Sequence, residues 1–292
     1  MRIREKYAIR DRIKLGLILL FLFIICVNLA HLVWKSIPNE KTATIETLLE
    51  TALQPVGSTM YIWGGGWDDT DSEAGGTSTR IGLSSQWKAF AKQQDADYDF
   101  EKHRFERENG LDCSGYVGWV LYNTFEVEEG QPGYVTTSTD LAESLAQRGW
   151  GILIHNPKSF EAGDIVSMEG HVWISLGTCE DGSVLLVHSS PPGVSVCGTN
   201  AVNVEGENYE DTEGKGKLER QTSRAVALAE AYMTTYHAKW QEKYPNRCVG
   251  ENYLEDVVVF RWNENTMSDA KEMQKLPAEE ILERISGKSE IP

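Results

Sequence analysis

The chain has little positive charge for its size. Its 292 residues include 28 Lys and Arg against 44 Asp and Glu, which gives a formal net charge of −16. Such an acidic protein repels polyphosphates, and no basic stripe runs along the sequence. We therefore expect no binding to nucleic acid, and a gain in solubility is a sufficient explanation of the acidity.

Cysteine is also scarce, with five residues and no CxxC motif. Zinc ribbons and thioredoxin-like redox centres are therefore not expected. Cys179 and Cys197 follow two neighbouring predicted strands, and they could form a disulfide if this part of the chain lies outside the cytoplasm. The alternative, two unpaired and partly buried thiols, stays open because spacing does not establish disulfide geometry.

Long hydrophobic runs are missing except near the start of the chain. Residues 15–34 are apolar apart from Asn28 and His31, and about 20 such residues can span a bilayer as a helix. The cations of residues 1–14 favour a cytoplasmic start, which places the chain from Lys35 onward outside.

This segment has two other interpretations. A cleaved signal peptide needs a small-x-small cleavage site, which the sequence lacks. A core helix of a cytoplasmic protein is disfavoured by the basic flank and by the length of the apolar run. We therefore expect a cytoplasmic segment over 1–14, one uncleaved transmembrane anchor over 15–34 and a tether over 35–41.

The remaining chain predicts helices first and then a run of strands, which is typical of an α+β fold with a helix packed on an antiparallel sheet. Helices are expected at 42–53, 116–125, 140–148, 225–240 and around 281–285. Strands are expected at 152–154, 165–166, 172–176, 184–187, 194–196 and 257–260. Residues 67–110 form a long polar segment, and residues 263–292 form a charged C-terminal tail.

Cys113 stands where a turn gives way to an apolar, helix-like run. Free amide groups and the helix dipole stabilise a thiolate at such a position, and Asp112 is well placed as the N-cap. His171 opens a predicted strand and can serve as the base, while His188 ends the next strand and can orient that base. The backbone N–H of Cys113 and the hydroxyl of Tyr61 are candidate contacts for an oxyanion.

Each of these residues also has a purely structural interpretation. Cys113 could be a buried thiol and His171 a satisfied core histidine. A zinc site made of Cys113, His171 and His188 would lack a fourth ligand at a recognisable spacing, so we expect no metal and no other cofactor. The remaining histidines considered, His103, His155 and His237, are expected at the surface or in packing contacts.

Four motifs occur in an order and spacing that resemble the NlpC/P60 cysteine peptidases, a papain-like family that cuts peptidoglycan stem peptides. The sequence Tyr61-Ile62-Trp63-Gly64-Gly65 resembles the family's Tyr-x-Trp-Gly-Gly element. Leu111-Asp112-Cys113-Ser114-Gly115-Tyr116-Val117 resembles its nucleophile motif. Residues 160–166 followed by Gly170-His171-Val172 resemble the strand pair that carries the base, and Val187-His188 resembles the third position.

The resemblance covers residues 42–262 and implies a papain-like catalytic domain, which the predicted anchor would place outside the membrane. It implies that Cys113 is the nucleophile, His171 the base and His188 the residue that orients the base. Contacts with the substrate or the oxyanion are expected from Tyr61, Trp63, Asp112 and Ser114. The implied reaction is hydrolysis of the bond between γ-D-glutamyl and the diamino acid of a peptidoglycan stem peptide.

The segment 67–110 departs from the family, which has a shorter connection at this place. This insertion could be a lid over the groove or a specificity loop. Two other functions stay open: a papain-like amidase or acyltransferase acting on another acyl substrate, and a non-catalytic scaffold that binds wall peptides. Product analysis separates hydrolysis from transfer, and an unreactive Cys113 would favour the scaffold.

Overall fold

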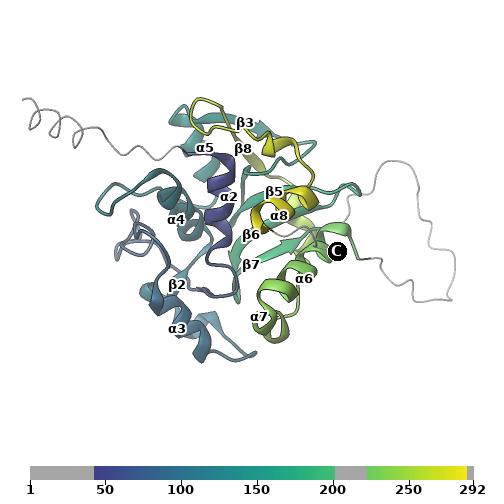
Figure 1. Ribbon diagram of the computed structural model, residues 1–292. Coiled ribbons are helices and arrows are strands. Elements are labelled where there is room, and N and C mark those ends of the chain that lie inside the picture. Colours follow the sequence, from purple (N-terminus) through teal and green to yellow (C-terminus); the bar gives the residue numbers. More distant parts are fainter. Residues whose placement is uncertain (1–42, 201–221, 288–292) are drawn as a thin grey trace, which may run out of the picture. The chain divides into compact units, whose positions relative to one another are not determined.

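The computed structural model describes residues 43–200 and 222–287 (Figure 1). The predicted anchor at 15–34, the tether at 35–41 and the loop at 201–221 lie outside the described residues. Within the two described ranges, no helix is both long enough and apolar enough to cross a membrane.

Eight strands form one sheet in the spatial order β2-β1-β7-β6-β5-β4-β8-β3. They are β1 (Met60–Tyr61), β2 (Gly110–Leu111), β3 (Gly151–His155), β4 (Ile165–Met168), β5 (His171–Thr178), β6 (Val184–Ser190), β7 (Gly193–Gly198) and β8 (Val258–Trp262). Neighbouring strands are antiparallel except β1 and β2, which run parallel. The predicted α+β class is confirmed, and the sheet is mixed rather than purely antiparallel.

The helices are α2 (Ile45–Leu53), α3 (Ser85–Gln93), α4 (Cys113–Phe125), α5 (Leu141–Gln147), α6 (Arg224–Tyr236), α7 (Ala238–Lys243) and α8 (Ala278–Ser286). Short 3-10 turns are η1 (Phe100–His103), η2 (Arg107–Asn109), η3 (Glu251–Leu254) and η4 (Met273–Lys275). The single helix predicted over 225–240 is wrong. It divides at His237, whose φ of −135° and ψ of 41° lie outside the helical region.

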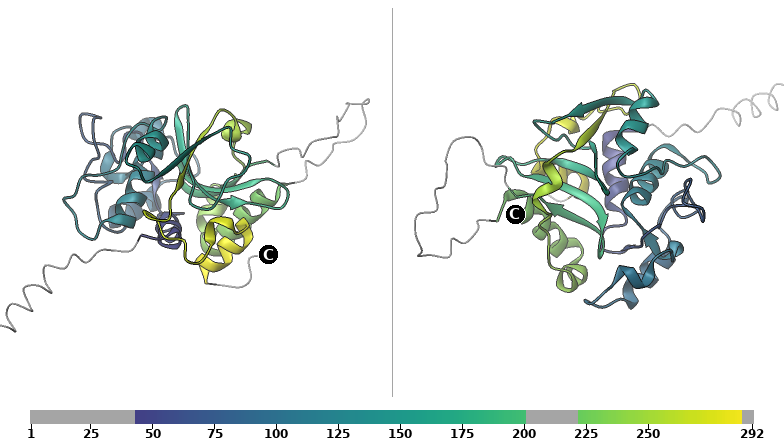
Figure 2. Two further views of the ribbon diagram at one scale, coloured as in Figure 1. Left: turned by 90° about the horizontal axis from the view of Figure 1, so that it is seen from above. Right: turned by 180° about the vertical axis from the view of Figure 1, so that it is seen from behind.

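The two faces of the sheet are covered by different parts of the chain. On one face, Val172 and Ile174 of β5 pack with residues of α2, α4, α6 and α8 in the larger hydrophobic cluster. On the other face, Trp173 of β5 packs beside Tyr253 of η3 in a smaller cluster. Helix α2 lies in front of the sheet in Figure 1 and behind it in the right-hand view of Figure 2. The strand β5 is buried on both sides, as its nearly continuous apolar sequence requires.

The insertion 67–110 has secondary structure of its own and packs against the rest of the domain. Helix α3 and both turns η1 and η2 belong to it, and strand β2 begins at its last residue, Gly110. Trp87 of α3 meets Trp119 of α4 edge to face, with ring centroids 5.7 Å apart. The Tyr98 hydroxyl donates a hydrogen bond to the Tyr61 carbonyl at 2.7 Å. The insertion is therefore attached to the helix that begins with Cys113.

The segment after residue 262 also contributes to the core. Ile281 and Leu282 of α8 are fully buried in the larger cluster, and the helix expected around 281–285 is confirmed. Cys179 and Cys197 are both free thiols and belong to different hydrophobic clusters. The disulfide considered from the sequence is therefore not formed, and the alternative of two buried thiols holds.

Candidate active site

Asp112 holds the N-terminus of α4, where Cys113 is the first residue. One oxygen of Asp112 accepts hydrogen bonds from the Gly115 amide at 2.7 Å and from the Ser114 hydroxyl at 2.9 Å. Its other oxygen accepts the Gly64 amide at 3.1 Å. An aspartate at this position satisfies helix amides that have no partner within the helix. It fixes both the start of α4 and the distance from α4 to the Gly64 turn.

Glycine lets the turn at 64–66 approach the first turn of α4 closely. A Cβ on Gly115 would lie 2.0 Å from the Gly65 carbonyl oxygen, and a Cβ on Gly66 would lie 2.4 Å from Gly115 Cα. Gly66 also has a φ of +102°, which residues with a side chain adopt only with strain. These glycines therefore keep the segment that carries Tyr61 in contact with the Cys113 helix.

His171 and His188 come from the adjacent strands β5 and β6, and their rings hydrogen-bond to each other. His171 Nε2 lies 3.0 Å from His188 Nδ1, and the ring planes meet at 80°. A hydrogen bond at Nε2 leaves Nδ1 of His171 as the ring nitrogen that can exchange a proton with another group.

The nucleophile segment lies where β5 and β6 separate. The ladder between the two strands stops one residue short of His188. Beyond it, the Ser189 hydroxyl donates to the Leu111 carbonyl at 2.7 Å, and the Val172 backbone N–H acts on the Cys113 sulfur, lowering its pKa against the effect of burial. Cys113 therefore lies beside the start of β5, which is the strand end that carries the predicted base.

Burial favours the uncharged forms of the site residues. It raises the pKa of Cys113 to about 12, with the Asp112 charge adding in the same direction, and it lowers the pKa of His171 to about 4. The pKa of His188 is lowered first by burial and then by His171 and Arg247. Burial also raises the pKa of Asp112 to about 6, although hydrogen bonds oppose the change. At neutral pH the resting site therefore holds a thiol and neutral imidazoles.

A cavity of about 250 Å³ opens beside Cys113. Tyr61, Trp63, Asp112 and Ser114, the residues expected to contact a substrate, all line it. Trp63 is 45% exposed and carries the Arg104 guanidinium 4.8 Å above its ring. Tyr61 is buried, which raises the pKa of its phenol, so the hydroxyl keeps its proton and can donate a hydrogen bond. The structure thus gathers these four residues around the nucleophile.

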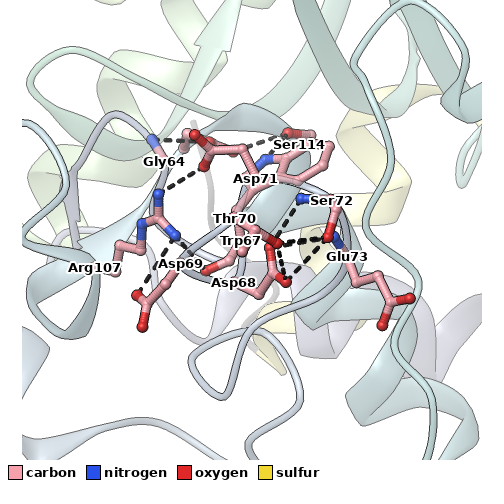
Figure 3. A network of polar contacts seen from close by, with 11 residues as sticks. Gly64, Trp67, Asp68, Asp69, Thr70, Asp71, Ser72, Glu73, Arg107 and Ser114 are labelled. Carbon is pink, nitrogen blue, oxygen red and sulfur yellow. Dashed lines mark hydrogen bonds and ion pairs between the residues drawn. The ribbon is translucent and has the colours of Figure 1, made fainter.

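A polar network joins the start of the insertion to α4 (Figure 3). The Trp67 indole N–H donates to the Ser114 hydroxyl at 3.0 Å. The Asp68 carboxylate accepts hydrogen bonds from residues 70, 72 and 73, which closes a tight loop. Arg107 pairs with Asp71 of this loop at 2.6 Å. Trp67 and Asp71 both line the cavity beside Cys113, so the insertion forms part of its wall.

Tyr253 of η3 is a site residue that sequence reasoning missed. Its hydroxyl lies 3.3 Å from His188 Nδ1, and its ring centroid lies 5.3 Å from that of His171. It belongs to a short irregular segment outside every motif, so neither spacing nor periodicity pointed to it. Only the tertiary structure brings it to the histidines.

The other histidines of the described ranges lie in other surroundings. His103 stacks on Tyr98 with ring centroids 5.5 Å apart, His155 is exposed, and His237 separates α6 from α7. Among the residues that the structure describes, no group of three or more His, Cys, Asp or Glu is arranged to hold a metal ion.

Comparison of the chain with protein-family models, with curated proteins and with solved structures gave no match. The functional interpretation therefore rests on the chemistry of the site and on the resemblance of the motifs.

Proposed function

We propose that the chain is a membrane-anchored cysteine endopeptidase with a papain-like domain of the NlpC/P60 type. Its substrate would be the stem peptide of peptidoglycan, cut between γ-D-glutamyl and the diamino acid. The observation that carries the proposal is Cys113 at the N-terminus of α4, beside the strand end that presents the hydrogen-bonded pair of His171 and His188. A thiol, a base and an orienting group are the parts that nucleophilic acyl transfer requires.

In the proposed reaction, the Cys113 sulfur attacks the scissile carbonyl carbon while His171 Nδ1 takes the thiol proton. The developing oxyanion would be stabilised by the Cys113 backbone N–H and by the Tyr61 hydroxyl. The tetrahedral intermediate then expels the amine, which takes the proton from His171 and leaves a thioester on Cys113.

A water molecule completes the cycle by attacking the thioester carbonyl, and His171 acts as the base for this water. The products are a free carboxylic acid and the regenerated thiol. His188 accepts a hydrogen bond from His171 Nε2 throughout, which fixes the ring and stabilises the imidazolium whenever His171 holds the extra proton. Because the resting pair is neutral, proton transfer accompanies the attack.

The cavity beside Cys113 supports a short peptide as the ligand. Tyr61, Trp63 and Trp67 supply aromatic surface, and Asp71 and Ser138 supply polar groups at the same wall. Small-ligand sites commonly combine mostly apolar walls with a few polar groups that fix orientation. Residues 15–34 would hold this domain at the outer face of the membrane, close to the wall, by their length and basic flank.

The test is mass spectrometry of defined stem peptides incubated with the full chain in mild detergent. We expect two fragments, one ending in a free D-glutamate γ-carboxyl, and no cleavage by the Cys113→Ala variant. Cys179→Ala is the matched control, because it removes a buried thiol outside the site and should retain activity. A new amide or ester would identify an acyltransferase instead. Intact peptide after incubation with the folded parent protein would contradict the proposed peptidase activity.

A further inference from the structure

The Nδ1 atom of His188 has two hydrogen-bonding neighbours, and this arrangement constrains the tautomers of both histidines. His171 Nε2 lies 3.0 Å away and the Tyr253 hydroxyl lies 3.3 Å away. A neutral imidazole carries one proton. His188 Nδ1 therefore either carries this proton and donates it to one neighbour, or has a lone pair that both neighbours share as donors. The two cases differ in which nitrogen of His171 holds a proton.

Only one of the two cases leaves His171 able to act as a base toward Cys113. If His188 Nδ1 donates to His171, then His171 Nε2 must accept, and the proton of the neutral His171 ring sits on Nδ1. That nitrogen is the one needed to take the thiol proton, so this tautomer is unproductive. If His188 Nδ1 accepts, His171 Nε2 carries the proton and its Nδ1 holds a free lone pair.

Tyr253 acts as a donor in this arrangement. Burial raises the pKa of Tyr253, so its phenol keeps the proton at neutral pH. The Ser190 side chain also acts on the Tyr253 hydroxyl and lowers its pKa, against the effect of burial. A serine hydroxyl can donate to the phenol oxygen, which leaves the phenol proton for His188 Nδ1.

We propose that Tyr253, supported by Ser190, is a positioning residue that selects the productive tautomer of the His171–His188 pair. It acts through His188 and touches neither Cys113 nor the substrate in the proposed reaction. The inference deepens the proposed cysteine peptidase mechanism and takes from it the role of His171. One net hydrogen bond shifts a two-state population about fivefold, so we expect Tyr253→Phe to raise the unproductive tautomer by about that factor.

The experiment is ¹⁵N NMR of histidine-labelled full-length protein in detergent, with signals assigned by His171→Gln and His188→Gln variants. The expected parent spectrum has the proton of His171 on Nε2 and an unprotonated Nδ1. Tyr253→Phe should show a mixture of both His171 tautomers, and Ser190→Ala should show a smaller change in the same direction. Tyr244→Phe is the matched control, because its hydroxyl donates to the Asp95 carbonyl, away from the histidines.

A parent spectrum with the proton on Nδ1 of His171, or an unchanged spectrum in a folded Tyr253→Phe variant, would overturn the inference. The kinetic counterpart is a kcat that falls in proportion to the lost fraction of productive tautomer, by less than fivefold, at unchanged KM. A raised KM at unchanged kcat would instead assign Tyr253 to substrate binding. The NMR experiment does not depend on turnover, so it tests the tautomer inference even if stem peptides are not the substrate.

Discussion

Burial is the dominant influence on the individual residues of the candidate site. It raises the pKa of Cys113 to about 12 and lowers that of His171 to about 4, so both groups are neutral at pH 7. Helix-terminal amides and the Val172 N–H act on the sulfur in the opposite direction but are outweighed. In the proposed mechanism, reactivity therefore depends on which nitrogen of each imidazole carries its single proton.

Replacing His171 by Gln should flatten the pH dependence of stability between pH 6.5 and about 4. The folded-state pKa lies below the ordinary value of 6.5, so in this window the unfolded chain binds a proton that the folded chain does not. The contribution of the neutral histidine is complete above pH 6.5 and is lost as the pH falls toward 4. The slope that disappears should be up to about 1.4 kcal/mol per pH unit.

Denaturant unfolding of parent and variant from pH 4 to 8 checks this expectation. Asp112 has the opposite sign, since its raised pKa stabilises the fold below pH 3.8 and this stabilisation is lost as the pH rises to about 6. Asp112 is present in both proteins, so the difference between the two curves reports His171 together with its effect on the pKa of His188. The free energies of unfolding above pH 7 are the internal reference. If the two proteins show parallel curves of this free energy down to pH 4, the lowered pKa of His171 is contradicted.

Among the individual site residues, the sequence identified only those that belong to a short local motif. Cys113, His171 and His188 each lie in a short recognisable pattern, and the structure brings them together, while their roles stay predictions. Tyr253 and Ser190 lie in no pattern. Tyr253 reaches His188, and Ser190 acts on Tyr253, only because the fold brings η3 to the end of β6, which is a long-range property.

The elements around the site depend on two close contacts, and the first is between α4 and the 64–66 turn. Gly115→Ala would place a Cβ 2.0 Å from the Gly65 carbonyl oxygen, a backbone atom that cannot rotate away. The gain in helix propensity of about 1 kcal/mol should be outweighed, giving a net loss of about 1–3 kcal/mol and displacement of Cys113. Thermal or denaturant unfolding measures the stability, and stem-peptide cleavage measures the displacement.

Gly118→Ala is the control within the same helix. The added Cβ would lie 2.5 Å from a side-chain methyl of Val135, which can move. We therefore expect a smaller loss of stability than for Gly115→Ala. A Gly115→Ala protein as stable and as active as the parent would show that the contact with Gly65 does not position the nucleophile.

The second contact joins β8 to the turn before β4. Arg261 of β8 donates to both oxygens of Asp164, at 2.9 and 2.7 Å, and Asp164 is fully buried. Burial raises the pKa of Asp164, while Arg261 opposes the change. Asp164→Asn would leave Arg261 without its closest buried charge and should cost about 3 kcal/mol in denaturant unfolding.

The exposed pair of Lys271 and Glu46 supplies the comparison. Their side chains are 59% and 29% exposed, so Lys271→Gln should cost at most about 1 kcal/mol. If Asp164→Asn and Lys271→Gln lower the free energy of unfolding equally, the buried pair stabilises the fold no more than a surface ion pair does.

Elements with strong periodicity or β-rich sequence were predictable, and the others were not. Helix α2, helix α4 and the strands β3 to β8 follow from apolar spacing and turn residues. The parallel pairing of β1 with β2 involves two residues in each strand, too few for any sequence pattern. The division between α6 and α7 at His237 was likewise not predicted, because no glycine or proline marks it in the sequence.

For the whole molecule, the segment after residue 262 stabilises the domain through α8. Leu282 is fully buried in the larger hydrophobic cluster, and Leu282→Ala should lower the free energy of unfolding by about 2–5 kcal/mol. Glu283→Ala, at the next and exposed position, should change it by less than about 0.5 kcal/mol. Denaturant unfolding compares the two, and similar values would show that α8 packs only loosely.

From the sequence this C-terminal segment was described by its charge, because the buried residues of α8 are few and lie among charged ones. Their partners are contributed by β5 and α2, which come much earlier in the chain. The amino-acid composition therefore indicated the charged, exposed side of the segment. Its buried side became apparent only from the packing of α8 in the fold.

The central claim, that Cys113 is an acyl-accepting nucleophile, is tested most directly by trapping the thioester. The full chain is mixed with an activated ester of a stem-peptide γ-D-glutamyl group, and the reaction is quenched in acid. The mass of the intact protein is then measured by mass spectrometry. We predict a mass increase equal to the acyl group, mapped to Cys113, absent from Cys113→Ala and strongly reduced in His171→Gln. An adduct on another residue, or none on a folded parent protein, would contradict the account.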